Sequence, residues 1–408
     1  MKGKVLIAGA LDTKGPDFLF VRDIMRDAGI ETLTIDIGII GDPGFEPDIA
    51  RADVAAAGGA NIADFVSGEH KDNAMQAMTN GLVEVVLKLH REGQVAGIFS
   101  MGGSGGTAVA TAAMRALPLG VPKVMVSTVG GGDVSVYSGG KDILFFPSIV
   151  DVAGLNRISK LIYANAANAM IGMVSATPPA VSDDKPLLAA SMFGNTTVCV
   201  SAVKDEVEKH GYEVLVFHAT GTGGRTMESL LADGHISGLL DITTTELADN
   251  VCGGVMDAGP DRCLAGPRAG LPTVLVPGCV DMANFWSVES MPKAFQERVL
   301  YRWNPNVTLM RTSVEENCEI GQRIAAAANA ATGPVVILIP RRGVSVLDSE
   351  GGEFWDPVAD QACFDAIRAD LRSGIPVIEM DCNINDPEFS AEIAKQMLLL
   401  LGPTQPNS

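Results

Sequence analysis

Aromatic residues are scarce in this sequence, and so are positive charges. Only 5% of its 408 residues are Phe, Trp or Tyr, and 30 Lys and Arg stand against 49 Asp and Glu, which gives a net charge of −19. Proteins that bind nucleic acids need a basic surface, and many stack bases on aromatic side chains. An acidic surface repels phosphate backbones and acidic lipid headgroups. We therefore expect neither a nucleic-acid partner nor a membrane partner.

Paired cysteines and long apolar runs are also missing. None of the seven cysteines belongs to a C-x-x-C pair, so the sequence predicts reduced thiols rather than disulfides or a zinc site. No apolar run has the roughly 20 residues that are needed to span a bilayer. The short apolar run that begins at residue 4 is typical of a first strand, not of a secretory leader. We expect a cytoplasmic protein.

Two nucleotide-binding signatures are absent. Gly9 ends the first apolar run and is followed by Ala10, Leu11 and Asp12, which does not meet the glycine spacing of the dinucleotide-binding fold. The lysine-bearing P-loop pattern does not occur either. The sequence therefore supports neither an NAD enzyme nor a standard P-loop NTPase.

What the sequence does have is a glycine-rich segment after the apolar run at residues 95–100 and before an Ala-rich helical stretch at residues 107–117. Its residues are Gly102, Gly103, Ser104, Gly105, Gly106 and Thr107. Glycines let backbone N–H groups approach a ligand closely, and the start of a helix adds partial positive charge. The pattern predicts a phosphate-binding loop. The alternative is a tight turn in an ordinary strand–loop–helix unit.

A second glycine-rich loop ends the next predicted strand, residues 122–127. It contains Ser127, Thr128, Gly130 and Gly131. Ligands of open α/β sheets bind at the carboxyl ends of the strands. We therefore expect the two loops to line one crevice.

A polar loop is predicted at residues 11–16, after a first strand at residues 4–10. It contains Asp12, Thr13 and Lys14. Lys14 would neutralise phosphate charge, and Asp12 is one of several strand-end aspartates that could hold Mg²⁺ through water. The alternatives are a solvated lysine and aspartates that begin turns or helices. The other strand-end aspartates are Asp36, Asp133, Asp151, Asp241 and Asp281.

The strand–loop–helix order recurs in the second half of the chain. Strands are predicted at residues 187–191, 212–218, 238–242, 272–276, 335–340 and 376–380. Residues 177–186 have the composition of a linker, so we divide the chain into domains 1–182 and 183–408. The predicted fold class is α/β, with two Rossmann-like domains, mainly parallel sheets and an interdomain cleft.

Polar residues at strand ends form a candidate substrate-binding site in the second domain. They are Gly221, Gly223, Arg225, Thr244, Thr245, Glu246 and Asp281. A guanidinium on a glycine loop can grip a phosphate or carboxylate, and Glu246 or Asp281 could act as an acid–base. The alternatives are a helix cap beside a surface arginine and hydroxyls that cap a helix. His218, at the end of an apolar strand, is the one histidine near this candidate site.

Taken together, these segments resemble one protein family. The resemblance is carried by DTKG after the first strand, SMGGSGGT, STVGGGD, PSIVDVAGLNRI, FGNTT, VFHATGTGGRTMESL, GLLDITTTELADNVCGGV and PGCVDMANF. Over essentially the whole chain the sequence is similar to the ATP-binding (Tm-one-like) proteins, a family related to the N-terminal inhibitory domain of the tomato mosaic virus resistance protein. The resemblance implies two Rossmann-like subdomains, bound ATP with Mg²⁺, and a homodimer. It places nucleotide contacts on residues 102–106, residues 127–131 and residues 12–15.

Two functions remain open at this point. The first is a nucleotide-binding protein that holds ATP and Mg²⁺ on its glycine-rich loops. The alternative is a small-molecule metabolic enzyme, a phosphotransferase or hydrolase, that acts on a small anionic metabolite in the interdomain cleft. The plant protein continues into a C-terminal TIM-barrel-like domain, whereas this sequence ends after a predicted helix near Leu400. A domain of that kind would therefore be a separate partner.

Overall fold

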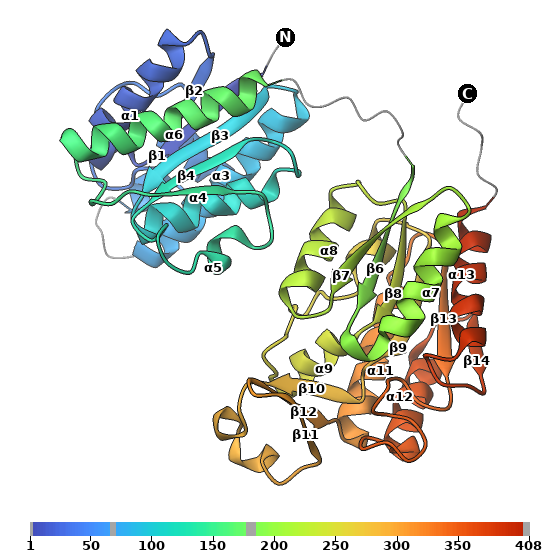
Figure 1. Ribbon diagram of the computed structural model, residues 1–408. Helices are drawn as coiled ribbons and strands as arrows, with labels where there is room; N and C mark the ends of the chain where they lie inside the picture. Colours follow the sequence, from blue (N-terminus) through green and yellow to red (C-terminus); the bar gives the residue numbers. More distant parts are fainter. Residues whose placement is uncertain (1–2, 66–70, 177–184, 403–408) are drawn as a thin grey trace. The chain divides into compact units, whose positions relative to one another are not determined.

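The computed structural model describes residues 3–65, 71–176 and 185–402. Two compact units make up the chain, Met1–Ala180 and Val181–Ser408 (Figure 1). The domain boundary expected between residues 182 and 183 falls in the stretch 177–184, outside the described residues. Both units are built from alternating strands and helices, so the predicted α/β class is confirmed.

Five parallel strands form the sheet of the first unit. They are β1 (Lys4–Gly9), β2 (Thr32–Asp36), β3 (Val95–Gly102), β4 (Lys123–Ser127) and β5 (Leu144–Pro147). Their order is β2-β1-β3-β4-β5, so the direction in which the sheet grows reverses between β1 and β3. Strands β1, β2 and β4 are almost wholly buried, as expected for parallel strands that are covered on both faces.

Helices cover both faces of this sheet. α1 (Leu11–Asp27) and α6 (Arg157–Ser175) pack on one face through Phe18, Val21, Tyr163 and Met170, and Figure 1 shows α6 lying across the strands. The other face is covered by α2 (Arg51–Ala57), α3 (Lys71–Arg91) and α4 (Ser104–Ala116). Two short helices complete the unit, the 3-10 helix η1 (Ile62–Phe65) and α5 (Ser135–Ser138).

Six parallel strands form the larger sheet of the second unit. They are β6 (Leu187–Met192), β7 (Glu213–His218), β8 (Gly238–Thr243), β9 (Thr273–Gly278), β13 (Val335–Pro340) and β14 (Val377–Met380). Their order is β14-β13-β9-β8-β6-β7, so this sheet reverses between β6 and β8. The recurring strand–loop–helix pattern in the sequence therefore corresponds to a strand order that the two sheets share.

The second unit is layered like the first. α7 (Thr197–Glu208) and α13 (Pro387–Leu401) cover one face of its parallel sheet. α8 (Thr222–Ala232), α9 (Thr245–Cys252), α11 (Val314–Asn329) and α12 (Pro357–Asp370) cover the other face. The shorter helices are α10 (Ala265–Arg268) and the 3-10 helices η2 (Gly194–Thr196), η3 (Val288–Ser290) and η4 (Lys293–Phe295).

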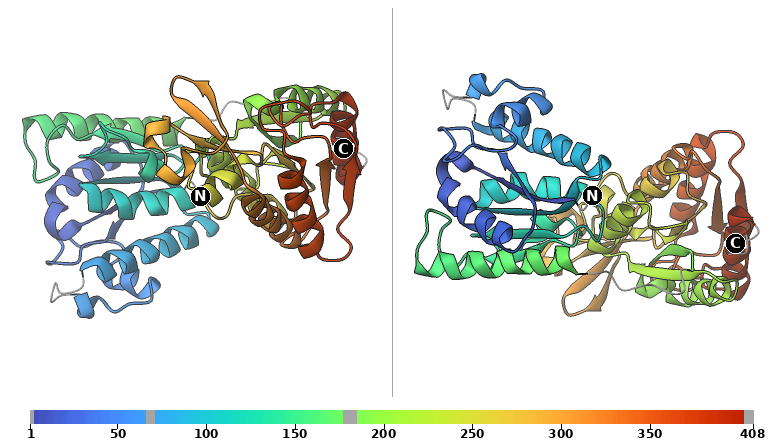
Figure 2. Two further views of the ribbon diagram at one scale, coloured as in Figure 1. Left: turned by 90° about the horizontal axis from the view of Figure 1, so that it is seen from below. Right: turned by 90° about the horizontal axis from the view of Figure 1, so that it is seen from above.

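An antiparallel sheet follows β9 and was missed by the sequence analysis. Its strands are β10 (Met282–Phe285), β11 (Leu300–Asn304) and β12 (Val307–Arg311), in the order β10-β12-β11. Figure 2 shows the hairpin of β11 and β12, coloured orange, projecting from its unit. The signal was present in the sequence, because Pro305 and Asn306 separate two short runs rich in β-forming residues.

Two segments predicted as loops are helical. The predicted polar loop at residues 11–16 belongs to α1, which begins at Leu11 and is kinked at Lys14, where φ is −129°. Pro16 then lies in the first turn after the kink, a position that tolerates proline. Similarly, α4 begins at Ser104 rather than at Thr107, so much of the glycine run forms its first turn.

Two broader expectations can also be compared with the structure. All seven cysteines are free thiols, as predicted. No helix among the described residues has both the length and the apolar character that crossing a bilayer requires.

Candidate functional site

The start of α4 lies at the carboxyl edge of the first unit's sheet. Ser104 and Gly105 are exposed there, directly after β3. β3 is one of the two strands between which the strand order reverses, and ligands of open parallel sheets bind outside the carboxyl ends of the strands at such a reversal. The topology therefore places the glycine-rich segment where a ligand is expected.

Three backbone N–H groups of this segment have no acceptor. The N–H of Thr107 donates to the carbonyl of Gly103 at 2.9 Å and closes the first turn. Among the described residues, no hydrogen bond is made by the N–H groups of Ser104, Gly105 and Gly106. Unpaired N–H groups at the start of a helix, together with the helix dipole, attract an anion. This turn can therefore receive a phosphate or carboxylate.

The second glycine-rich loop adjoins the first. The Oγ1 of Thr107 lies 2.7 Å from the Oγ of Ser127, and the N–H of Thr128 donates to the carbonyl of Gly102 at 3.2 Å. Thr128 and Gly131 are exposed. The structure thus brings the two loops together at one edge, as the sequence predicts.

Gly102, Ser104 and Gly106 also match the G-x-S-x-G spacing of a hydrolase nucleophile elbow, a match that the sequence analysis overlooked. In such an elbow the serine sits on a strained turn between a strand and a helix, and a general base lies within hydrogen-bond reach. Ser104 has no positive φ, and within the described ranges its hydroxyl is bonded to no histidine. The geometry therefore favours anion binding over nucleophilic catalysis.

Asp12, Thr13 and Lys14 point toward different neighbours. The Oδ2 of Asp12 accepts the N–H of Ile40, in the segment after β2, at 2.9 Å. The Nζ of Lys14 donates to the carbonyl of Val152, in the segment after β5. Thr13 is exposed. These three predicted contacts therefore lie near the glycine-rich edge without converging on one point.

Two buried carboxyl oxygens near this edge have no hydrogen-bond partner in the described part of the chain, the Oδ1 of Asp12 and the Oδ2 of Asp36. Asp36 is fully buried at the end of β2, and its Oδ1 accepts the N–H groups of Leu11 at 3.1 Å and Gly38 at 2.8 Å. Burial raises the pKa of Asp36 against the effect of these bonds, and the charge of Asp12 adds to the rise. Oxygen ligands are those that Mg²⁺ prefers, so this pair could hold such a cation.

In the second unit, the glycine-rich turn before α8 is bound to Glu246. The N–H groups of Gly221 and Gly224 donate to its Oε1 at 2.6 Å and 3.1 Å. The guanidinium of Arg225 donates to the carbonyl of Asp257 at 2.6 Å. These N–H groups are therefore occupied, although Arg225 itself stays exposed.

The hydroxyls of Thr244 and Thr245 are likewise engaged. Thr244 donates to the carbonyl of Val276 at 3.2 Å, and Thr245 donates to the carbonyl of Met282 at 3.1 Å. Thr244, Thr245 and Glu246 are fully buried. Their contacts hold neighbouring strands together, and a substrate-binding role for them remains a prediction.

A buried arginine that the sequence analysis missed explains the position of Glu246. Arg262 lies 2.6 Å from Glu246, 2.6 Å and 2.7 Å from the two carboxyl oxygens of Asp241, and 3.1 Å from Glu228. Burial acts to lower the pKa of Arg262, but the neighbouring carboxylates outweigh it and raise the pKa. These partners are far apart along the chain, so no local pattern identifies the network.

Asp281 belongs to another buried cluster, with Asp348, Asp360 and Arg311. The Oδ2 of Asp281 accepts the hydroxyl of Ser345 at 2.8 Å, while its Oδ1 has no hydrogen-bond partner. Arg311 lies 2.6 Å from Asp360 and 3.8 Å from Asp348. Burial and then the charge of Asp348 raise the pKa of Asp281 to about 7 and that of Asp360 to about 9. Asp348 and Asp360 therefore compete for the single positive charge of Arg311.

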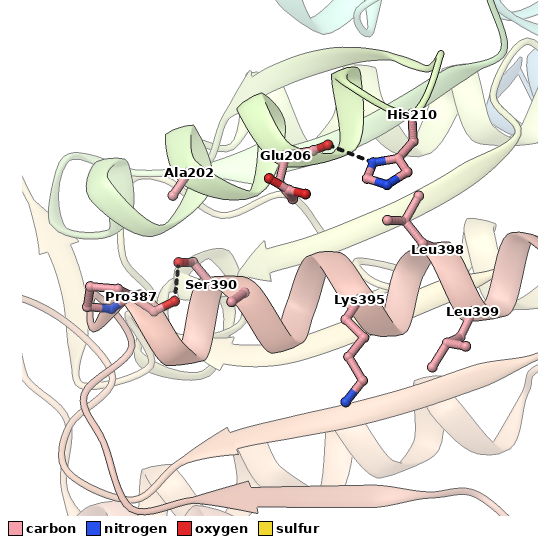
Figure 3. A pocket seen from close by; sticks show the side chains of 9 residues that line it. Ala202, Glu206, His210, Pro387, Ser390, Lys395, Leu398 and Leu399 are labelled. Carbon is pink, nitrogen blue, oxygen red and sulfur yellow. Dashed lines mark hydrogen bonds between the residues drawn. The ribbon is translucent and has the colours of Figure 1, made fainter.

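A surface groove of about 590 Å³ lies between α7 and α13 (Figure 3). Glu206 and His210 line it on one side, and Lys395 and Leu398 line it on the other. The ring of His210 is already bonded to the carbonyl of Glu206 at 3.0 Å. None of the predicted site residues lines this groove.

A possible group of metal ligands lies near the start of α13. Cys382, Asp386 and Glu388 each place one ligand atom within 4.8 Å of the others. Cys382 is buried, whereas Asp386 is partly exposed and Glu388 is exposed. Exposed carboxylates often lie close together without a metal, so this group alone does not indicate a metal site.

The chain matches two family models and several curated relatives. Residues 3–179 match the N-terminal domain of the uncharacterised protein family UPF0261, and residues 185–401 match its C-terminal domain. A UPF0261 protein of Clostridium tetani is 45% identical over 402 residues, which cover 98% of this chain and 100% of that protein. The ToMV resistance protein Tm-1(GCR237) of Solanum lycopersicum is 41% identical over 332 residues, which cover 80% of this chain and 44% of the tomato protein.

Similarity to solved structures is much weaker. A UDP-GlcNAc 2-epimerase of Methanocaldococcus jannaschii, in complex with UDP-GlcNAc and UDP, is 8% identical and gives a TM-score of 0.21, over 98% of this chain and 93% of its own. A score this low carries no argument. The predicted similarity to the tomato proteins is confirmed. The two family models together span both units, and the chain therefore belongs to the uncharacterised protein family UPF0261.

Proposed function

We propose that this chain is a nucleotide-binding protein that holds ATP, together with Mg²⁺, on its first unit. The proposal is carried by the N–H groups of Ser104, Gly105 and Gly106, which have no acceptor among the described residues and lie where the strand order reverses. The phosphates of a nucleotide offer acceptor oxygens to these groups, and the helix dipole favours their negative charge. Thr128, Gly130 and Gly131 line the same edge and would border the bound phosphates.

The net charge is −19, but the negative charges do not fall on the turn that is proposed to bind phosphate. The first turn of α4 contains no acidic residue. The ammonium group of Lys14 lies at the same edge of the sheet and keeps two N–H groups beyond the one that it donates to Val152. A lysine near phosphate groups offsets part of their charge.

Asp12 and Asp36 fit the role of Mg²⁺ ligands. Each has one buried oxygen without a hydrogen-bond partner, and a bound cation would remove the cost of burying that oxygen. When present, Mg²⁺ would neutralise part of the charge of the triphosphate. We assign this role to the two residues as part of the proposal.

The alternative, a phosphotransferase or hydrolase that acts on a small anionic metabolite, has less support. It relies on Arg225 to grip the substrate, and Arg225 is exposed but bonded to Asp257. It relies on Glu246 or Asp281 for acid–base chemistry, and both are fully buried, as are Thr244 and Thr245. A general acid or base must come within hydrogen-bond reach of its substrate, and Glu246 and Asp281 are buried away from the surface of their unit. We therefore propose nucleotide binding as the function of the first unit. The family resemblance also leads us to propose a cytoplasmic homodimer and a separate TIM-barrel-like partner.

Calorimetric titration of the full chain tests the proposal. ATP is titrated with and without Mg²⁺, and NAD serves as the control because the dinucleotide fingerprint is absent. We expect saturable ATP binding that strengthens with Mg²⁺, and no binding of NAD. Absence of ATP binding in the presence of Mg²⁺ would refute the proposal.

A further inference from the structure

Residues 148–156, which connect β5 to α6, hold an isoleucine in a conformation that isoleucine rarely adopts. The φ of Ile149 is +65°, in the left-handed region, where a β-branched side chain crowds its own backbone. The N–H of Val150 donates to the carbonyl of Ser148 at 2.7 Å. Ile149 is thus the central residue of a three-residue turn with positive φ, a type that is rare and strained.

This turn is fixed beside the candidate phosphate-binding edge. The N–H of Ser148 donates to the carbonyl of Ser127 at 3.0 Å, and the hydroxyl of Ser148 donates to the carbonyl of Val150 at 2.6 Å. Ser127 is the last residue of β4 and contacts Thr107 in the first turn of α4. Two hydrogen-bonded steps therefore connect Ile149 to the N–H groups proposed to bind phosphate.

The other end of the connection is also anchored. The ammonium group of Lys14 donates to the carbonyl of Val152, and the N–H of Gly154 donates to the Oδ2 of Asp17 at 3.2 Å. Val152 itself is fully buried. The position of Ile149 is therefore set by hydrogen bonds and packing on both sides of it.

The side chain of Ile149 gains little in return for this strain. It is 71% exposed, so burial does not offset the cost of the backbone conformation. Strained residues that the surrounding structure holds in place occur mainly at functional sites. An exposed aliphatic side chain beside a phosphate-binding turn offers an apolar surface to the part of a nucleotide that is not phosphate.

We propose that Ile149 contacts the base of the bound nucleotide and gives the site its preference for a nucleotide over bare polyphosphate. This assignment rests on the proposed function and extends it to a residue that sets specificity. Val136 is also exposed, at 76%, but it has an ordinary φ. The contact is therefore assigned to Ile149.

The variant Ile149→Asn tests the assignment because asparagine tolerates a left-handed backbone and removes the apolar surface. ATP and inorganic tripolyphosphate are titrated into the full chain by calorimetry, and melting temperatures are recorded. We expect the Kd for ATP to rise about tenfold, as loss of a buried aliphatic contact predicts, with no change for tripolyphosphate. The melting temperature is expected to stay the same or to rise.

Two further variants serve as controls. Ile149→Val keeps an apolar β-branched side chain and is expected to keep the affinity of the parent for ATP. Leu161→Asn removes an exposed aliphatic side chain from α6, 61% exposed, and is expected to bind both ligands like the parent.

The outcomes separate this assignment from the function on which it rests. Parent-like ATP affinity of Ile149→Asn would overturn the assignment, and so would an equal loss for ATP and tripolyphosphate. If the unaltered protein binds neither ligand, the proposed function fails and the assignment fails with it. Titration of the unaltered protein alone is enough to recognise this failure of the proposed function.

Discussion

At the scale of single residues, burial separates carboxylates that the sequence presents alike. Asp133 and Asp281 both follow a strand of a parallel sheet. Asp133 is exposed, and the hydrogen bond that it accepts from Ser135 lowers its pKa. Asp281 is fully buried, and burial raises its pKa to about 7. The first group lies at the surface, where it can meet a ligand, whereas the second belongs to the core.

The raised pKa of Asp281 predicts how stability depends on pH. Between its ordinary value of 3.8 and the folded value of about 7, the folded protein keeps a proton that the unfolded chain has released. The free energy of unfolding therefore decreases as the pH rises through this range. We predict that the melting temperature falls over the same range in thermal scans followed by circular dichroism.

The variant Asp281→Asn assigns this effect to the residue. It removes the titrating proton and keeps an acceptor for Ser345, so we expect a smaller fall in melting temperature than the parent shows. The fall should not disappear, because the pKa of Asp249 is also raised to about 7 by burial. Asp133→Asn is the exposed control. A variant whose stability depends on pH as steeply as that of the parent would contradict the prediction.

At the scale of elements, Arg262 joins three parts of the second unit. Its carboxylate partners are Asp241 in β8, Glu246 in α9 and Glu228 in α8. Glu246 in turn accepts N–H groups of Gly221 and Gly224 at the start of α8. The buried guanidinium therefore fixes the strand and both helix starts through one network.

We predict that Arg262→Met lowers the free energy of unfolding by about 3–5 kcal/mol, because it leaves buried carboxylates without a counter-charge. Urea unfolding followed by circular dichroism measures the change. The matched control is Arg268→Met. Arg268 is 60% exposed and pairs with Asp261 at 3.6 Å, so its removal is expected to cost less than about 1 kcal/mol. Equal effects of the two substitutions would contradict a structural role for the Arg262 network.

Elements with a strong local pattern could be predicted from the sequence. α3 (Lys71–Arg91) is such an element, because apolar residues recur along it with helical spacing. β5 is four residues long and partly exposed, so neither its length nor its burial gives a clear signal. The antiparallel hairpin of β11 and β12 carried a turn signal that was not used.

The candidate site could be predicted only in part, because local sequence patterns do not show contacts between distant residues. The glycine-rich loops near Gly103 and Thr128 both follow the carboxyl ends of parallel strands, which lie at one edge of the sheet. Their proximity could therefore be predicted. The partners of Glu246 and Asp281 are set by contacts between residues far apart in the chain, and burial in the folded state decides their chemistry. The turn with positive φ at Ile149 could not be predicted from the sequence either, because isoleucine disfavours that conformation.

At the scale of the whole molecule, the sheets of the two units reverse their strand order at corresponding strands. The units differ in whether the helix that starts at this reversal is exposed. In the first unit, Ser104 at the start of α4 is exposed. In the second unit, the corresponding helix start is Thr245 of α9, which is fully buried and bonded to Met282 of β10. The antiparallel sheet thus contacts this position in the second unit. The comparison favours the first unit over the second as the location of the proposed nucleotide site.

This difference predicts that Arg225→Ala leaves ATP binding intact. Arg225 belongs to the second unit and bonds to the carbonyl of Asp257. We expect the Kd for ATP to stay within about twofold of the parent value, because Arg225 shares no bonding partners with the residues proposed to bind ATP. Calorimetry measures it. A large loss of affinity would show that the nucleotide also contacts the second unit.

The most direct test of nucleotide binding at the start of α4 is a calorimetric titration of Gly105→Val with ATP and Mg²⁺. A Cβ at Gly105 would meet only the terminal methyl of Met75, at 3.3 Å, so the fold should persist while the branched side chain screens the N–H groups from phosphate. Gly172→Val is the matched control, because Gly172 is exposed in α6 and a Cβ there meets nothing within 4 Å.

We predict that the Kd for ATP rises about a hundredfold in Gly105→Val, as loss of charge-assisted hydrogen bonds implies, and stays at the parent value in Gly172→Val. Melting temperatures of both variants are recorded to establish that they are folded. A folded Gly105→Val protein that binds ATP as tightly as the parent would contradict the account.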